Sequence, residues 1–249
     1  MKYMGSKSRI AKYIVPIIQK YIDDNNIENY LELFVGGANV IDKIKCKNRY
    51  GNDINKYLIA LLKRVQDNGN LYDNVDKILY NDCRNFYQNK PSDREYENWE
   101  VGNIGFLSSY NGRFFDGGYA KTGIEKTKYG SRVRNYYEES KNNILNQNLS
   151  NIKFLNYDYK ALKKNIKNYV IYLDPPYFGK KEYKNSKEFD YDYFWNFCRE
   201  LSKNNFVFIS EENAPEDFKI IWEQKVNRSI KANDKTDSIE KLFIYKGEK

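Results

Sequence analysis

The sequence predicts an α/β fold built on a largely parallel sheet and interrupted by a long insertion. The first observation is a strand–helix–strand–helix alternation after an opening helix, within residues 1–66. The second is the loss of this alternation over about residues 67–149, where helical periodicity continues without a convincing buried strand. The third is the return of strand-like segments from residue 150 onward. Such alternation is typical of a parallel sheet covered by helices.

The individual elements follow from hydrophobic periodicity and from glycine, proline and asparagine breaks. Helices are expected over residues 10–21, 39–45 and 55–66. Strands are expected over residues 30–35, 49–51, 152–155, 170–173 and 206–209, with a terminal pair near 220–230 and 241–246. Residues 1–66 and 150–249 are therefore predicted to form one α/β domain, and residues 67–149 an insertion into it.

Composition excludes several kinds of chemistry. The chain has no histidine, and its three cysteines show no C-x-x-C spacing. Histidine acid/base catalysis, Ser-His and Cys-His nucleophiles and ordinary zinc sites are therefore excluded, and no metal is expected. Apolar runs are only strand-sized, and the N-terminus is not typical of a secretory signal. We expect a cytoplasmic protein.

Positive charge is concentrated in one glycine-rich, aromatic segment. The formal net charge is +8, which favours a polyanionic partner, and a general enrichment in lysine is the alternative explanation. Residues 112–134 hold six basic side chains against two acidic ones: Arg113, Lys121, Lys126, Lys128, Arg132 and Arg134. Arginines among glycines and aromatic rings are suited to phosphate and base-edge contacts.

Two motifs in the first 66 residues predict a nucleotide-like ligand. Gly36 and Gly37 follow a strand, where glycine lets the backbone approach a ligand closely, although a tight structural turn is the alternative. Asp53 ends the next strand, seventeen residues after Gly36. An acid there accepts hydrogen bonds from ribose hydroxyls in nucleotide-binding α/β folds, and the alternative is a helix N-cap.

The most specific motif is Asp174-Pro175-Pro176-Tyr177, which follows the apolar strand at residues 169–173. The prolines end the strand and hold the backbone that carries the acid and the ring, although a structural turn is the alternative. Asp174 and the Pro175 carbonyl can accept the two N–H groups of a planar aromatic amine, and Tyr177 can stack on its ring. Orientation of such an amine toward a sulfonium methyl supplies about 7 kcal/mol or more of the barrier.

On these motifs the sequence resembles the Dam-type (D12 class, α-group) DNA N6-adenine methyltransferases over nearly its whole length. Tyr3-Met4-Gly5-Ser6-Lys7 matches the family's first motif, and Phe34-Val35-Gly36-Gly37-Ala38 matches the second, except that Ala38 replaces a frequent glycine. The resemblance implies a class I S-adenosylmethionine-dependent methyltransferase fold. That fold is a Rossmann-like, mixed seven-stranded sheet with helices on both faces. The resemblance implies that residues 1–66 and 150–249 form the catalytic, S-adenosylmethionine-binding domain and that residues 67–149 are a mainly helical target-recognition insertion that binds DNA.

The resemblance also implies the cofactor, S-adenosylmethionine, its product S-adenosylhomocysteine, and a set of cofactor contacts. These contacts are Tyr3, Lys7, Phe34, Gly36, Gly37, Asp53, Asp158 and Asp174. The catalytic residues it implies are Asp174, Pro175, Pro176 and Tyr177. A chance motif at Tyr3 and a helix cap at Asp158 are the alternative interpretations.

Double-stranded DNA is the partner that the resemblance implies, with contacts at Tyr110, Asn111, Arg113 and Phe115 beside the basic residues above. A target adenine must be flipped out of the duplex, which costs a few kcal/mol. Residues 117–134 diverge from GATC-reading members, so the recognition sequence stays open. So do the oligomeric state and a cognate restriction endonuclease as a second partner.

Other functions remain as alternatives at this stage. An RNA, protein-glutamine or N4-cytosine methyltransferase would share the fold, but Asp174 and the basic insertion favour DNA adenine. A nucleic-acid-binding module with a degenerate cofactor site is the non-enzymatic alternative.

Overall fold

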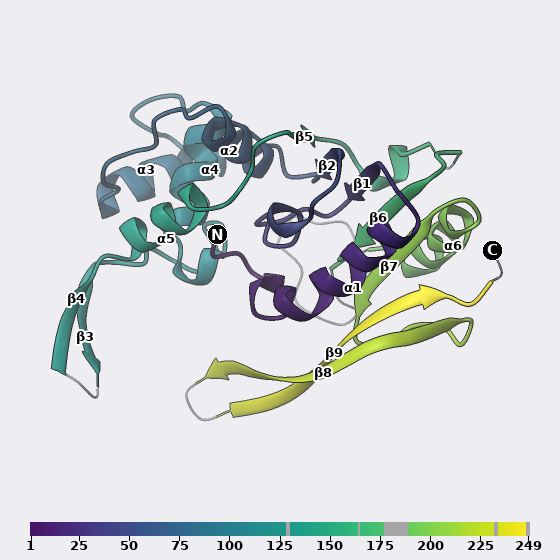
Figure 1. Cartoon of the computed structure of the whole chain (residues 1–249). Coiled ribbons are helices and arrows are strands. Elements are labelled where there is room, and N and C mark those ends of the chain that lie inside the picture. Colours follow the sequence, from purple (N-terminus) through teal and green to yellow (C-terminus); the bar gives the residue numbers. More distant parts are fainter. Residues whose placement is uncertain (128–129, 164, 177–188, 232–233, 248–249) are drawn as a thin grey trace. The chain divides into compact units, whose positions relative to one another are not determined.

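A mixed seven-stranded sheet and a mainly helical segment make up the computed structural model (Figure 1). The structure describes residues 1–127, 130–163, 165–176, 189–231 and 234–247. The chain divides into two units. The first unit comprises Met1–Arg9, Gly36–Lys43 and Asp53–Asn156, and the second comprises Ile10–Val35, Ile44–Asn52 and Tyr157–Lys249.

The sheet has the strand order β5-β2-β1-β6-β7-β9-β8. Its strands are β1 (Asn29–Glu32), β2 (Asn48–Asn52), β5 (Ile152–Leu155), β6 (Tyr169–Leu173), β7 (Phe206–Glu211), β8 (Phe218–Lys231) and β9 (Asp234–Tyr245). Strand β1 is parallel to β2 and β6, and β6 is parallel to β7, whereas β9 is antiparallel to β7 and β8. The expected mixed seven-stranded sheet is confirmed.

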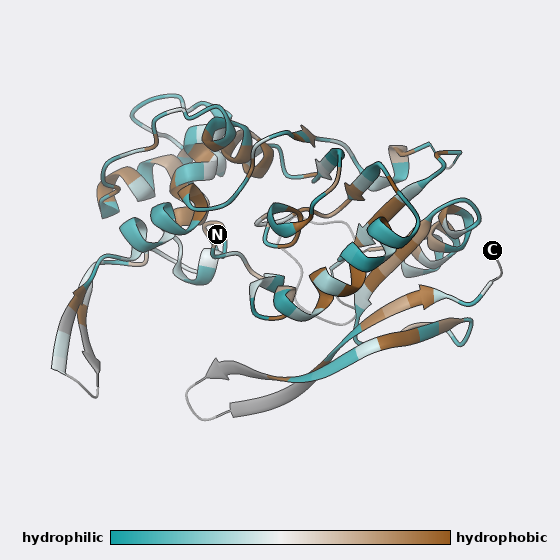
Figure 2. Ribbon diagram, viewed as in Figure 1, coloured by the Kyte–Doolittle hydropathy of each residue, from teal (hydrophilic) through white to brown (hydrophobic). Residues whose placement is uncertain are grey.

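Helices cover both faces of the central strands within the second unit. Because side chains alternate along a strand, successive residues of β7 point to opposite faces. Phe206 and Phe208 meet the ring of Tyr21 on α1 (Ala11–Asp24), at centroid distances of 5.3 and 5.0 Å. Val207 and Ile209 instead belong to the core beneath α6 (Tyr191–Ser202). The hydrophobic colouring of β6 and β7 reflects this burial from two sides (Figure 2).

The strand order places a topological switch point between β1 and β6. From β1 the chain moves outward through β2 and β5, and it then returns to β6 on the other side of β1. Ligands of open α/β sheets bind outside the carboxyl ends of the strands at such a point. Glu32 pairs with Tyr172, so both strands end near one another, and Phe34 and Asp174 follow shortly after.

The first of these strands leads into a turn where a helix was expected. Residues 39–45 form only a short 3-10 turn at Ile41–Lys43, so the predicted helix is wrong. Ala38 adopts a left-handed conformation, with φ of 55°. The side chain of Asn39 donates to Met1 O and Ser6 Oγ instead of capping a helix. The residues after Asn39 in this segment are too few to offset the free-energy cost of helix nucleation.

Helix α2 (Lys56–Gln66) is the expected amphipathic helix, and the residue that caps its N-terminus is not Asp53. The side chain of Asn55 accepts hydrogen bonds from Tyr57 N at 3.0 Å and Leu58 N at 3.1 Å. Asn55 is thus the N-cap. The alternative interpretation of Asp53 as the cap is therefore removed.

The region predicted as an insertion contains three α-helices and a hairpin among its described residues. The helices are α3 (Lys77–Tyr87), α4 (Asn98–Leu107) and α5 (Tyr136–Leu145), and the hairpin pairs β3 (Gly123–Thr127) with β4 (Gly130–Arg134). Helix α4 packs closely on α2, since a Cβ at Gly102 would lie 2.2 Å from Tyr57 O. The hairpin escaped prediction because it is exposed, with Ile124 at 75% and Val133 at 73%.

Strands β8 and β9 form a ribbon longer than the sequence predicted. Only Ile209–Glu211 of β7 pair with β9, so most of the ribbon pairs only with itself in the described sheet (Figure 1). None of the described helices is long and apolar enough to cross a membrane.

Candidate functional site

The glycine loop after β1 is shaped around the N-terminal motif. Gly36 has φ of 47°, and a Cβ added to it would lie 2.9 Å from Cε1 of Tyr3. A Cβ at Gly37 would lie 3.0 Å from Cβ of Tyr3. The backbone conformation therefore favours glycine at Gly36, and the close approach of the tyrosine favours glycine at both positions. Tyr3 also packs against Phe106, at a centroid distance of 5.7 Å.

Asp53 is connected directly to this loop. Its Oδ2 accepts from Gly36 N at 3.1 Å, and its Oδ1 accepts from Asn55 N at 2.9 Å. Burial raises the pKa of Asp53 to about 6, and the two amide donors only partly offset that effect. Each carboxylate oxygen can accept a further hydrogen bond, so the group retains the capacity to bind a pair of hydroxyls.

Lys7 lies in the same unit as the loop and Asp53, in a 3-10 turn at Lys7–Arg9. It is buried, and its Nζ donates to Gly5 O at 3.3 Å. The first unit thus brings together Tyr3, Gly36, Gly37 and Asp53, four of the residues that the sequence predicted as cofactor contacts.

The remaining predicted cofactor contacts belong to the second unit. The ring of Phe34 packs on Tyr159 at 5.2 Å and on Phe194 at 6.1 Å. Asp158 is exposed and caps the 3-10 turn Tyr159–Ala161, accepting from Lys160 N at 2.9 Å. The cap that was the alternative interpretation of Asp158 is therefore present. Its second carboxylate oxygen retains acceptor capacity.

The Asp174-Pro175-Pro176 segment leaves the carboxyl end of β6, as the sequence predicted. Asp174 is partly exposed and Pro175 is buried. The hydroxyl of Tyr191, at the start of α6, donates to the Pro176 carbonyl and so restrains the segment. Tyr177 lies outside the described residues.

A buried hydrogen bond supports the strand behind this segment. Tyr172, two residues before Asp174, shares a hydrogen bond of 2.7 Å with Ser210 Oγ. Burial and then the charge of Asp174 raise the pKa of Tyr172 well above its ordinary value, so its hydroxyl stays neutral.

The predicted DNA contacts belong to the first unit and differ in exposure. Tyr110 is 57% exposed and stacks on Tyr136 at 6.3 Å, and Asn111 beside it has φ of 55°. Arg113 forms an ion pair with Asp116. Phe115 is buried against Tyr80 and Tyr87, so it supports the loop from within.

The basic residues of the hairpin are described only in part. Lys121 is exposed, and Arg134 contacts Glu139 at 2.9 Å. Glu139 also binds Lys2 Nζ, at 3.1 Å. Lys128 and the side chains of Lys126 and Arg132 lie outside the described part of the chain.

The sequence did not predict three residues that support the glycine loop, the N-terminal motif or the Asp174-Pro175-Pro176 segment. These residues are Asn39, Gln147 and Tyr191. Each acts through a tertiary hydrogen bond to a backbone carbonyl. The sequence gives no signal for these contacts, because the residues that form each hydrogen bond are distant from one another along the chain.

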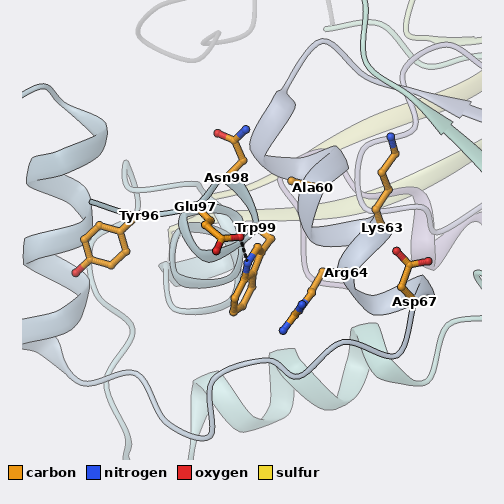
Figure 3. Close-up of a pocket in the computed structure, with 8 residues that line it drawn as sticks. All are labelled: Ala60, Lys63, Arg64, Asp67, Tyr96, Glu97, Asn98 and Trp99. Carbon is orange, nitrogen blue, oxygen red and sulfur yellow. Dashed lines mark hydrogen bonds between the residues drawn. The ribbon is translucent and has the colours of Figure 1, made fainter. Parts of the chain in front are cut away.

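One surface pocket of about 570 Å³ lies apart from these residues within the first unit (Figure 3). It is lined by Ala60, Lys63, Arg64, Asp67, Tyr96, Glu97, Asn98 and Trp99. Arg64 stacks over the Trp99 ring at 4.4 Å, and acidic residues balance the two cations. The pocket lies at the C-terminal end of α2, whereas Asp53 precedes the N-terminal end. It is not the predicted cofactor site.

The strand order, with β9 antiparallel between β7 and β8, is that of the Rossmann-like class I methyltransferases. Residues 3–239 match the family described as D12 class N6 adenine-specific DNA methyltransferase, and the chain belongs to that family. The resemblance inferred from the motifs is thereby confirmed.

A curated relative is the modification methylase StsI of Streptococcus sanguinis. It is 25% identical to this chain over 234 residues, which cover 83% of this chain. The aligned region covers 32% of that relative, so the chain spans about a third of its length.

Proposed function

We propose that the chain is a site-specific DNA methyltransferase that acts on the exocyclic N6 of an adenine flipped out of double-stranded DNA. S-adenosylmethionine is the proposed methyl donor. The observation that carries the proposal is the Asp174-Pro175-Pro176 segment at the carboxyl end of β6, beside the switch point of the sheet, in a chain of this family.

The residues of the glycine loop fit the proposed donor. A nucleoside needs a hydroxyl acceptor and a close approach to backbone, and Asp53 and the two glycines offer both. Tyr3, Lys7, Phe34 and Asp158 would complete the contacts. The donor supplies a methyl group on a sulfonium centre, which needs no metal to react with an amine.

The acid and the first proline act on the acceptor. The amine lone pair of adenine is delocalised into its ring, so the amine is a weak nucleophile. Hydrogen bonds from the amine to Asp174 and to the Pro175 carbonyl favour a more tetrahedral nitrogen with an available lone pair. The hydroxyl of Tyr191 donates a hydrogen bond to the Pro176 carbonyl, which restrains the backbone of this segment. Holding the amine in line then supplies about 7 kcal/mol or more of the barrier.

The first unit offers groups that suit duplex DNA. Base flipping costs a few kcal/mol, which cations on phosphates and aromatic rings in the stack offset. The exposed ring of Tyr110 stacks on the ring of Tyr136. Arg134 is the last residue of β4, two residues before Tyr136. The curated relative carries the name modification methylase, which supports a role in DNA modification. A cytoplasmic location and a cognate restriction endonuclease are further parts of the proposal.

A direct assay tests the proposed reaction. Purified protein incubated with S-adenosylmethionine and unmethylated plasmid should produce N6-methyladenine, detected by nucleoside mass spectrometry. Modification-sensitive sequencing of the same plasmid should place the methylated base in one short motif. The Asp174→Ala variant is the control for contaminating activity. Methylated cytosine, or methylation only of RNA or protein offered in parallel, would contradict the proposal.

Salt dependence tests the proposed DNA surface. Replacing Arg132 and Arg134 together with alanine should reduce the slope of log affinity against log salt by about 1.8, since each phosphate contact contributes about 0.9. Fluorescence anisotropy with a labelled duplex measures this slope. Lys203→Ala is a matched control, because Lys203 pairs with Glu200 on α6 of the other unit. An unchanged slope in the double variant would place the DNA surface elsewhere.

A further inference from the structure

The glycine loop contains a residue in a conformation that its side chain disfavours. Ala38 has φ of 55° and no exposed surface. Among the described residues, six of the eight non-glycine residues with positive φ are asparagines, which tolerate this region, and Ala38 is one of the two exceptions. The left-handed conformation is disfavoured for alanine because its Cβ comes too close to the following carbonyl oxygen. The surrounding contacts must therefore hold it.

Gln147 supplies those contacts from beyond the C-terminal end of α5. Its Nε2 lies 2.9 Å from Gly37 O, 3.1 Å from Ala38 O and 3.3 Å from Asn39 Oδ1. The two carbonyls lie on either side of the Ala38 Cα, so one amide group restrains both peptide units of the strained residue. All three partners are acceptors, which settles the orientation of the amide, because a flipped amide would turn Oε1 toward them.

Asn39 extends this restraint to the N-terminal motif. Its Nδ2 donates to Met1 O at 3.1 Å and to Ser6 Oγ at 2.9 Å, while its Oδ1 accepts from Gln147. Ser6 belongs to the same segment as Tyr3, which packs on Gly36 and Gly37. All of these residues belong to the first unit. The network therefore connects α5, the glycine loop and the N-terminal motif.

We propose that Gln147 is a positioning residue that holds Ala38 in the left-handed conformation and thereby sets the glycine loop for cofactor binding. The inference rests on the proposed function, in which this loop and Asp53 bind S-adenosylmethionine. The loop must present Gly36 N to Asp53, at 3.1 Å, while keeping Gly37 against Tyr3. Without the two restrained carbonyls, Ala38 relaxes toward negative φ and displaces both glycines.

A double-mutant cycle with Ala38→Gly tests this role, because glycine adopts positive φ without the penalty. Gln147→Met keeps the length of the side chain and removes the donor. Alone, this change should weaken S-adenosylmethionine binding about tenfold, as measured by calorimetry. A loss of this size corresponds to about one neutral hydrogen bond. In the Ala38→Gly background the same change should weaken binding less than about threefold, since the restraint is no longer needed.

Steady-state kinetics separates positioning from general destabilisation. Gln147→Met should raise KM for S-adenosylmethionine and leave kcat at saturating cofactor within about twofold, because the chemistry uses other residues. Equal losses of affinity in both backgrounds, or an unchanged KM, would overturn the proposal. If Gln147→Met alone does not fold, recovery of folded, cofactor-binding protein in the double variant supports the proposal, and its absence overturns it.

Asp53→Ala distinguishes failure of this inference from failure of the proposed function. If wild-type protein does not bind S-adenosylmethionine, or Asp53→Ala binds it as tightly as wild type, the proposed cofactor site is wrong and the inference is overturned with it. If Asp53→Ala loses binding while Gln147→Met does not, only the role of Gln147 is overturned.

Discussion

Replacement of Asp174 with alanine should lower the rate of methyl transfer by about a thousandfold, the size of effect seen when one preorganised hydrogen-bonding group is removed from a reacting centre. Affinity for S-adenosylmethionine should change by less than about threefold, because most of the proposed cofactor contacts lie on other segments. Single-turnover transfer of labelled methyl to plasmid DNA measures the rate, and calorimetry measures the affinity.

Asp174→Asn is the matched control for that variant. Asparagine keeps one carbonyl acceptor at the same place but introduces an N–H donor opposite the amine, so an intermediate rate is expected. The free energy of unfolding should differ little among the three proteins, since Asp174 is partly exposed. A rate for Asp174→Ala close to that of wild type would remove the acid from the proposed chemistry.

Asp53→Asn should change stability and cofactor affinity in opposite directions. Burial raises the pKa of Asp53 from 3.8 to about 6. Between these pH values the folded protein keeps a proton that the unfolded chain has lost, so the free energy of unfolding falls as pH rises. At pH 7.5 the ionised carboxylate is then destabilising by up to about 3 kcal/mol. Loss of one amide hydrogen bond in the variant reduces the expected gain to about 1–2 kcal/mol.

Cofactor binding should depend on the same ionisation. In the proposed site the carboxylate accepts hydrogen bonds from two ribose hydroxyls, so Asp53→Asn should weaken S-adenosylmethionine binding about 30- to 100-fold at pH 7.5. Wild-type affinity should fall as pH drops through about 6, where protonation removes acceptor capacity, whereas the variant should be insensitive to pH there. Urea unfolding and calorimetry across pH 5–8 measure both effects. A variant that is less stable at pH 7.5, or a wild-type affinity that ignores pH, would contradict this account.

Local patterns predicted most of the sheet and the motifs that follow its strands. The apolar runs before Gly36 and Asp174 identified β1 and β6, since buried parallel strands read as continuous hydrophobic segments. The position of Asp53 after a strand was equally visible. The sequence could not decide whether Asp53 or Asn55 caps α2, because both side chains are good N-caps. Only the hydrogen bonds in the structure show that Asn55 is the cap.

The misses share a physical cause. Residues 39–45 follow a strand and a glycine turn, where the alternation predicted a helix, yet hydrogen bonds from Asn39 to Met1 and Ser6 compete with a helix. The apolar side chains Ile124 and Val133 of β3 and β4 are exposed, so the hairpin has no buried apolar face that a sequence pattern could indicate. Gln147 lies more than a hundred residues from the loop it holds. Long-range contacts of this kind leave no periodic pattern in a sequence.

The segments that make up the first unit also limit how this chain can be recombined with its relatives. Met1–Arg9 and Gly36–Lys43 form one unit with Asp53–Asn156, although two segments of the sheet separate them along the chain. A chimaera that exchanges only residues 67–149 would replace Gln147 while retaining the carbonyls it binds. A graft intended to transfer sequence specificity therefore needs all three segments of the first unit, so that the N-terminal motif and the glycine loop are exchanged together with the helices.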